Sequence, residues 1–175
     1  MKKNNILSSV FGFLALASGS IWFGAYVARL LITYKMFQET EPTLKSFLNS
    51  TNLSAVFEVI SPIVILTSIT YLILIVSFTT FLFTSSFKLK ENGWLFIIAA
   101  IIYITLPFEA ILLINDYKLF LLFLNEQFSS EKVIEFIAYS QYNLGSFPII
   151  QILSYLSIPY LLIFKPFTLQ IKDED

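Results

Sequence analysis

Histidine and cysteine are both absent from this 175-residue sequence, and arginine occurs only once, as Arg29. Without imidazole or thiolate ligands the chain cannot build the usual haem, zinc or iron–sulfur sites, and it cannot form a disulfide. Histidine is also missing as a general acid or base. No nucleotide-binding loop or nucleophile triad can be recognised. We therefore expect no cofactor and no metal site, although carboxylates remain as ligands for a hard cation such as magnesium.

Charged residues are scarce as well. They make up 13% of the sequence, against about 25% in an average soluble domain, whereas 57% of the residues are hydrophobic and 17% are aromatic. The mean hydropathy is +0.77 and the formal net charge is −1. This composition is typical of a membrane protein. Because binding a phosphate backbone requires clustered basic residues, we expect no nucleic-acid partner.

Four apolar runs occupy most of the sequence and predict transmembrane helices at about residues 6–28, 59–87, 94–115 and 147–164. A helix rises about 1.5 Å per residue, so it needs about 20 residues to cross a hydrocarbon core about 30 Å thick. Four crossings leave little chain for a separate soluble domain. The predicted fold class is all-α: an integral membrane four-helix bundle, formed by residues 1–175 as a single domain.

The first run can also be interpreted as a cleaved secretory signal. Two lysines precede it, and the segment Ala15-Leu16-Ala17 matches a cleavage pattern. However, the apolar stretch continues without a break as far as Ala28, which favours a full transmembrane helix. Cleavage would leave three helices.

The polar segment 88–93 is too short for anything but a tight connection. The second and third helices should therefore form an antiparallel hairpin, with Phe87 and Trp94 at nearly the same depth. Both helices are longer than a bilayer requires. Their excess should project on the opposite side, where the 38–52 connection and a short helix within 130–142 would form a small helical cap.

Two groups of small polar or apolar residues predict how the helices pack. In the first helix Ser8, Gly12, Ser20, Gly24 and Ala28 lie on one face, which suits close helix contact in lipid, either within the chain or across a homodimer. The second helix is rich in Ser and Thr, whose hydroxyl groups can bond to their own helix or to a neighbour. We favour packing within the chain for both groups.

Lysine positions predict the orientation. With four crossings, one side of the membrane receives six lysines: Lys2, Lys3, Lys88, Lys90, Lys165 and Lys172. Basic residues on the other side lie largely in longer connections: Arg29, Lys35, Lys45, Lys118 and Lys132. By the positive-inside rule both termini should be cytoplasmic, in the cell (inner) membrane.

The strongest candidate for a functional residue is Glu109. Counted from Trp94, it lies about 22 Å along the third helix, inside the hydrocarbon core, where an ionisable group is costly unless paired, protonated or hydrated. It can serve as a cation or proton site, or simply pair with Arg29 near the outer boundary. Glu58 is a further candidate, more simply explained as a solvated helix end. Several polar residues could complete a cluster with Glu109: Tyr26, Tyr103, Tyr117, Asn143 and Gln151.

Three functions remain compatible with these features. The first is a non-enzymatic accessory subunit or assembly partner in a membrane complex, with protein partners or a homo-oligomer. The second is a small transporter or channel that uses Glu109 with Arg29. The third is a membrane enzyme acting on a lipid-soluble substrate, with Glu109 or Glu58 as acid or base. The sequence resembles no known family closely enough to choose among them.

Overall fold

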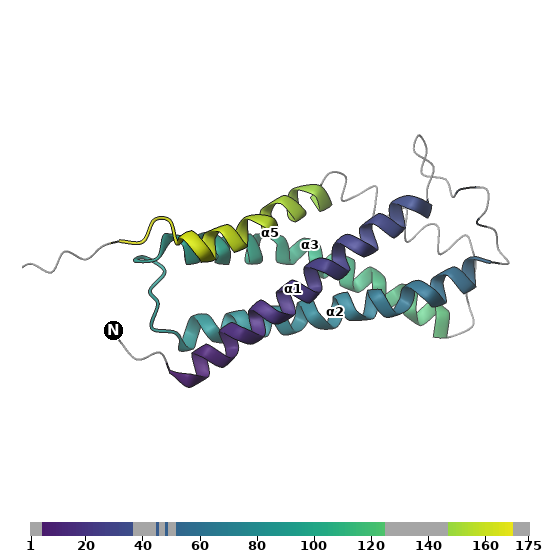
Figure 1. The fold of residues 1–175 in the computed structure, drawn as a ribbon. Helices are drawn as coiled ribbons and strands as arrows, with labels where there is room; N and C mark the ends of the chain where they lie inside the picture. The colour runs from purple at the N-terminus through teal and green to yellow at the C-terminus, as the bar shows by residue number, and fades with distance from the viewer. Residues whose placement is uncertain (1–4, 37–44, 46–47, 49–51, 125–146, 170–175) are drawn as a thin grey trace, which may run out of the picture.

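A computed structural model describes residues 5–36, 45, 48, 52–124 and 147–169. The described chain contains four long helices, which run side by side in alternating directions (Figure 1). They are α1 (Ile6–Met36), α2 (Leu53–Thr84), α3 (Gly93–Leu124) and α5 (Phe147–Phe164). Each is long and apolar enough to cross a membrane. The all-α four-helix bundle is thus confirmed, and the chain is a multipass membrane protein. The predicted cap falls largely outside the described residues.

The helices differ in length from the apolar runs that predicted them. Helix α1 continues past residue 28 to Met36 and has 31 residues. Like α2 and α3, it is longer than a bilayer crossing requires. The predicted span of residues 6–28 therefore lies within a longer helix. Helix α2 stops at Thr84, three residues before the predicted end, because the backbone of Ser85 is extended. Only α5, with 18 residues, is close to the minimum needed for a crossing.

The hairpin between α2 and α3 has the predicted geometry. The rings of Phe87 and Trp94 lie 6.0 Å apart, at the same end of the bundle. The chain that leaves α5 returns to this hairpin, where the Gly93 amide donates to the Phe167 carbonyl at 3.0 Å. The hairpin and the segment after α5 therefore lie on the same side of the membrane.

Helices α1 and α2 pack closely, and a glycine accounts for part of this contact. A Cβ atom at Gly12 would lie 3.1 Å from the Phe81 side chain on α2, so the missing side chain allows the approach. Gly24 is different, since a Cβ atom there would meet nothing within 4 Å. The predicted packing of small residues within the chain thus holds at Gly12 and does not extend to Gly24.

Hydroxyl groups on α2 mostly bond to their own helix, as expected. Thr67, Thr70 and Thr80 donate to backbone carbonyls four residues earlier, at 2.6–2.8 Å. Thr79 instead reaches Tyr103 on α3, at 2.8 Å between the two oxygen atoms. These bonds satisfy polar groups within lipid without requiring a pore.

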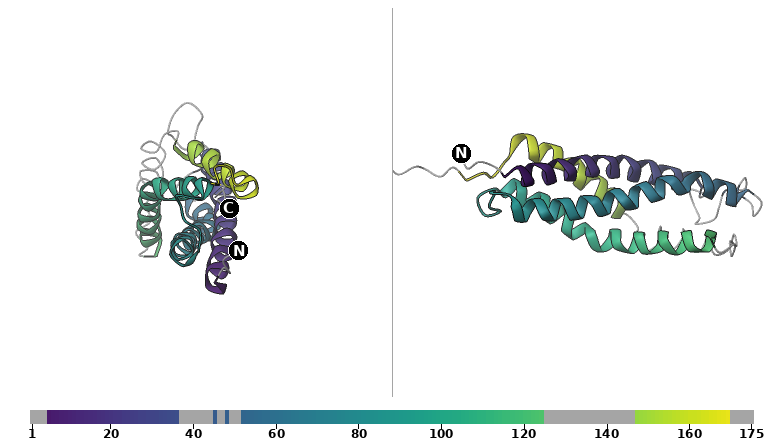
Figure 2. Two further views of the ribbon diagram at one scale, coloured as in Figure 1. Left: turned by 90° about the vertical axis from the view of Figure 1, so that its left-hand side faces the viewer. Right: turned by 90° about the horizontal axis from the view of Figure 1, so that it is seen from below.

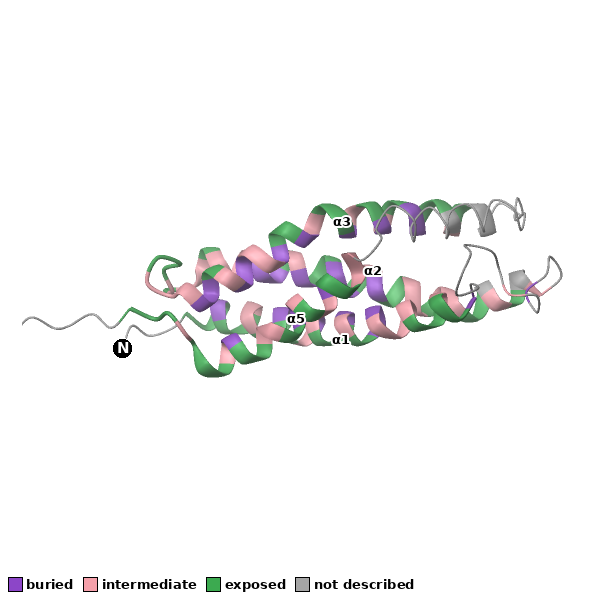
Figure 3. Cartoon of the chain, turned by 90° about the horizontal axis from the view of Figure 1, so that it is seen from above, coloured by how far each residue is buried: buried purple, intermediate pink, exposed green. Residues whose placement is uncertain are grey.

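The inward face of α3 changes character halfway along the helix. Buried residues recur at alternating spacings of three and four: Leu95, Ile98, Ile102, Thr105, Glu109, Leu112 and Asp116. This spacing keeps one stripe of the helix towards its neighbours. The stripe is apolar as far as Ile102 and largely polar beyond it. The bundle interior along α3 therefore has an apolar half and a polar half. In Figure 3, buried segments alternate with exposed ones along the helices.

Candidate functional site: a buried polar cluster above an apolar cavity

Glu109 belongs to a hydrogen-bonded chain that joins three helices. The Gln151 Nε2 atom on α5 donates to Glu109 Oε1 on α3 at 2.7 Å. The Tyr26 hydroxyl on α1 donates to Gln151 Oε1 at 3.0 Å. Their exposed fractions are 2% for Glu109, 0% for Gln151 and 5% for Tyr26. Each polar group is thus bonded inside the protein, as burial in an apolar medium requires.

The local sequence explains how Gln151 reaches this position. Helix α5 begins at Phe147 and carries Pro148 in its first turn, where a missing amide hydrogen costs no helical bond. The Phe147 ring stacks on Phe108 of α3, with centroids 3.9 Å apart. This contact holds the start of α5 beside Glu109, and Gln151 follows one turn later on the inward face.

Arg29 binds Asp116 rather than Glu109. Its two terminal nitrogens each lie 2.5 Å from one carboxylate oxygen of Asp116, which makes a bidentate pair between α1 and α3. The exposed fractions are 19% for the Arg29 side chain and 9% for that of Asp116. Of the alternatives predicted for Glu109, the direct pair with Arg29 is therefore not formed, because Arg29 pairs with Asp116 instead. Asp116 follows Glu109 by two helical turns, so the pair lies farther along the same stripe.

A layer of aromatic residues lies next to Glu109, on its side towards the α2–α3 hairpin. The Tyr155 hydroxyl, one turn after Gln151, lies 3.2 Å from that of Thr105. The Trp22 ring packs against Tyr155 and Tyr71, with centroids 4.6 and 5.3 Å apart. Trp22 is fully buried, and its Nε1 atom has no hydrogen-bond partner among the described residues. This layer separates the polar cluster from the apolar half of the bundle.

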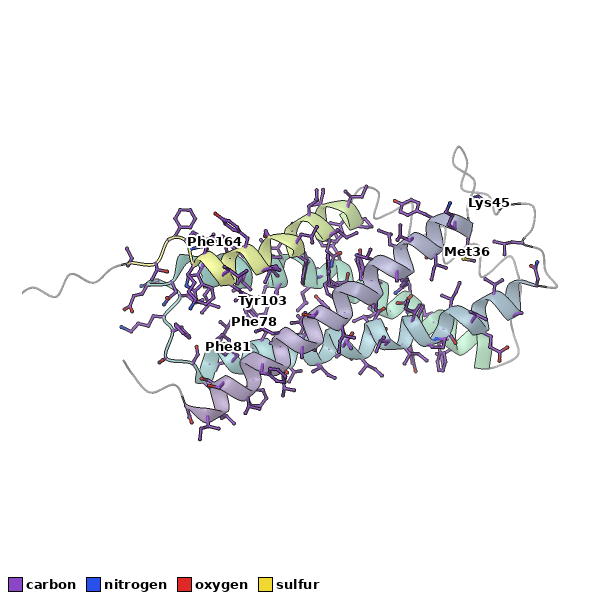
Figure 4. All side chains as sticks on the ribbon, viewed as in Figure 1. Met36, Lys45, Phe78, Phe81, Tyr103 and Phe164 are labelled. Atoms are coloured by element: carbon purple, nitrogen blue, oxygen red, sulfur yellow. The ribbon has the colours of Figure 1, made fainter. Side chains whose placement is uncertain are left out.

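The apolar half contains a cavity of about 490 Å³. All four helices contribute to its walls, and its lining is mainly aliphatic and aromatic. Phe78 and Phe81 of α2 lie at the same end of the bundle as Phe164 of α5 (Figure 4), and the first two line the cavity. Tyr155 lines its inner end. Figure 2 shows the same bundle along its axis and from below. The volume lies within the range of about 300–1,000 Å³ that is usual for pockets of small molecules.

The remaining predicted candidates lie apart from this cluster. Glu58 is exposed on α2, and the ion pairs of the described residues do not include it. Tyr103 bonds Thr79 instead, and Tyr117 is 63% exposed. Asn143 lies outside the described residues. Within the described part of the suggested polar set, Tyr26 and Gln151 join Glu109.

Sequence reasoning missed Asp116 as the partner of Arg29. The signal was present in the stripe on α3, because Glu109, Leu112 and Asp116 follow the three-and-four spacing that also places Ile102 and Thr105 inward. Continuing that pattern for one more turn would have placed Asp116 inside the bundle.

The chemistry available to this arrangement is hydrogen bonding and proton exchange. Among the described residues, no three carboxylates come close enough to hold a metal ion. An amide between a carboxyl group and a phenol can donate to one and accept from the other, and turning the amide over reverses both bonds.

Comparison with known protein families, with curated proteins and with solved structures finds no match. The four apolar helices establish the class of the chain, a multipass membrane protein.

Proposed function

We propose that this chain is a non-enzymatic membrane protein, an accessory subunit or assembly partner within a membrane complex. The observation that supports this proposal is that its buried ionisable groups are hydrogen-bonded to other side chains inside the bundle. Arg29 is bonded to Asp116, and Glu109 to Gln151. The residues that line the cavity include none of these four. Charged residues that serve transport usually face a water-filled pathway, whereas here they connect α1, α3 and α5.

These bonds would give the bundle a rigid outer surface. Two buried polar connections hold α1 against α3 and α5 at two depths, so these helices resist sliding or rotation relative to one another. The outer surface consists of apolar side chains such as Val76, Phe83 and Leu153, which are 62–86% exposed. Such a surface can contact lipid or the apolar face of another membrane protein.

Purification from native membranes tests this proposal. The tagged chain, extracted in mild detergent, should migrate as a complex larger than itself on native gels, with a partner in fixed stoichiometry after cross-linking in the intact membrane. An unrelated multipass protein with the same tag controls for non-specific capture. A chain that runs alone and cross-links to no protein contradicts the proposal.

A second candidate function, proton transfer in a small transporter or channel, is favoured by the chain from Tyr26 through Gln151 to Glu109. When Glu109 is ionised, the amide of Gln151 donates to it. A proton that binds Glu109 would turn the amide over, so that the carboxyl group donates to Gln151 Oε1 and Nε2 donates to the Tyr26 oxygen. The proton stays on Glu109 in this step, and the reversal of the two hydrogen bonds is transmitted from α3 to α1.

Proteoliposomes with a pH-sensitive dye inside distinguish the two functions. Proton transfer predicts a flux that Glu109→Gln abolishes and that the matched control Glu58→Gln preserves, because Glu58 is exposed. The accessory role predicts no flux above empty liposomes for any of the three proteins. Equal flux from native protein and Glu109→Gln would eliminate the proton-transfer candidate.

A further inference from the structure

The cavity has the length of one membrane leaflet. Along α1 its walls extend from Ser8 to Phe23, which corresponds to about 22 Å of helix. Half of a bilayer is about 20–22 Å thick when its headgroup region is included, and the hydrocarbon part of that half is about 15 Å. At the inner end Tyr155 contributes to the lining and to the aromatic layer that includes Trp22. The cavity is therefore an apolar channel that begins near one membrane surface and ends near the middle of the bundle.

One side of the cavity can be reached from the bilayer. Its lining includes Phe13 and Leu16 of α1 and Leu156 of α5, whose exposed fractions are 70%, 52% and 54%. Side chains that both line the cavity and face outward mark an opening between α1 and α5. A two-chain lipid can insert one chain there while its other chain stays among the surrounding lipids.

A positive charge lies at the end of this channel that is near the membrane surface and the α2–α3 hairpin. The Lys165 ammonium group is 5.8 Å from the centroid of the Trp94 ring, and Trp94 lines the cavity. Among the described residues, no carboxylate pairs with Lys165. Trp94 is 5% exposed, and its Nε1 atom has no hydrogen-bond partner in the part of the chain that the structure describes. An exposed cation beside the mouth of an apolar channel suits an anionic oxygen group.

From these three features we infer that the cavity binds one acyl chain of an anionic membrane phospholipid. The acyl chain fills the space between α1 and α5. The phosphate group lies at Lys165. The site is independent of the accessory role proposed above, because it uses the opposite half of the bundle from Arg29, Asp116 and Glu109.

Native mass spectrometry of the delipidated protein tests this site. The protein is titrated with a phosphatidylglycerol and, separately, with a phosphatidylcholine that has the same acyl chains. We expect one tightly bound phosphatidylglycerol, with weaker binding of phosphatidylcholine. Lys165→Gln should weaken phosphatidylglycerol binding about fivefold, as expected for one lysine near an acidic lipid. The control Lys90→Gln removes the same charge from the hairpin and should leave binding nearly unchanged.

A second pair of variants tests the channel itself. Ile98→Trp adds bulk to a residue that lines the cavity and is 3% exposed, so it should reduce binding at least about tenfold. Ile104→Trp makes the same change at a residue of α3 that is 67% exposed, and should not affect binding. Circular dichroism confirms that each variant is folded, and the lysine pair provides the test if Ile98→Trp is not.

Four results would overturn the inference. The first is equal binding of the two phospholipids. The second is equal loss with the two lysine variants. The third is full retention of phosphatidylglycerol by a folded Ile98→Trp. The fourth is saturable binding of free palmitate, in a parallel titration, that displaces phosphatidylglycerol at lower concentration, because it would identify a fatty acid as the ligand.

Discussion

The guanidinium group of Arg29 and the carboxylate of Asp116 form two parallel bonds between α1 and α3, both at 2.5 Å. These residues are 87 positions apart in the sequence, and both side chains are largely buried. A bidentate pair of this kind restricts the rotation of both helices as well as their depth. It therefore links the first helix of the chain to the outer half of the third.

Arg29→Gln should lower the free energy of unfolding by about 3 kcal/mol, because it leaves Asp116 as an uncompensated, largely buried charge. Combining it with Asp116→Asn should recover most of that loss, because neither remaining side chain is then charged. Unfolding by sodium dodecyl sulfate in mixed micelles, followed by circular dichroism, measures the double-mutant cycle. Additive losses from the two substitutions would show that the pair does not couple the helices.

Gln151→Leu should destabilise the bundle more than Tyr26→Phe. The first variant removes the donor to Glu109 and the acceptor for Tyr26, with an expected loss of about 2–3 kcal/mol. The second removes one hydroxyl and leaves the amide–carboxyl bond intact, with a loss of about 1 kcal/mol. The same unfolding assay ranks them. Equal losses would mean that the bond between Gln151 and Glu109 contributes little.

Leucine should be tolerated at Gly24 and not at Gly12. A side chain at Gly12 meets Phe81 at 3.1 Å already at its Cβ atom, whereas nothing lies within 4 Å of that atom at Gly24. Gly12→Leu should cost about 1–3 kcal/mol through overpacking against α2. Gly24→Leu should stay within about 0.5 kcal/mol of the native protein in the same assay. A larger loss at Gly24 would contradict an open face at that position.

Because the sequence contains no cysteine, single cysteines can report the orientation without background labelling. The positive-inside rule predicts that Lys90→Cys and Thr168→Cys react with a membrane-impermeant maleimide only after cells are opened. Lys45→Cys, in the connection between α1 and α2, should react in intact cells. Labelling of Lys90→Cys from outside would reverse the predicted orientation. Labelling of Lys90→Cys and Thr168→Cys from opposite sides would contradict the fold itself.

The prediction from sequence succeeded where local composition decides the outcome. Runs of apolar residues longer than a bilayer requires form helices, because only a helix satisfies its backbone within lipid. The short segment 88–93 produced the expected hairpin, with Phe87 beside Trp94. Boundaries were less accurate at α1, which continues to Met36, because a helix can persist beyond the hydrocarbon where polarity increases.

The prediction of the site was partial for a related reason. Hydropathy and helix rise place Glu109 within the membrane, and its need for partners follows from burial. They do not specify rotation about the helix axis or the lateral neighbours of each helix. Pairing Arg29 with Glu109 was reasonable from depth alone, yet the structure brings Gln151 to Glu109 and Asp116 to Arg29.

Because length and apolarity act locally, the amino-acid sequence alone was enough to identify a multipass membrane protein with four helices, little charge and few side chains suited to catalysis. Which polar residues meet, and where the interior stays open, became known only from the folded bundle. Helix packing depends on side-chain shape across elements that are distant in the chain. That packing places a bonded polar cluster around Glu109 and an apolar cavity beneath the aromatic layer at Trp22.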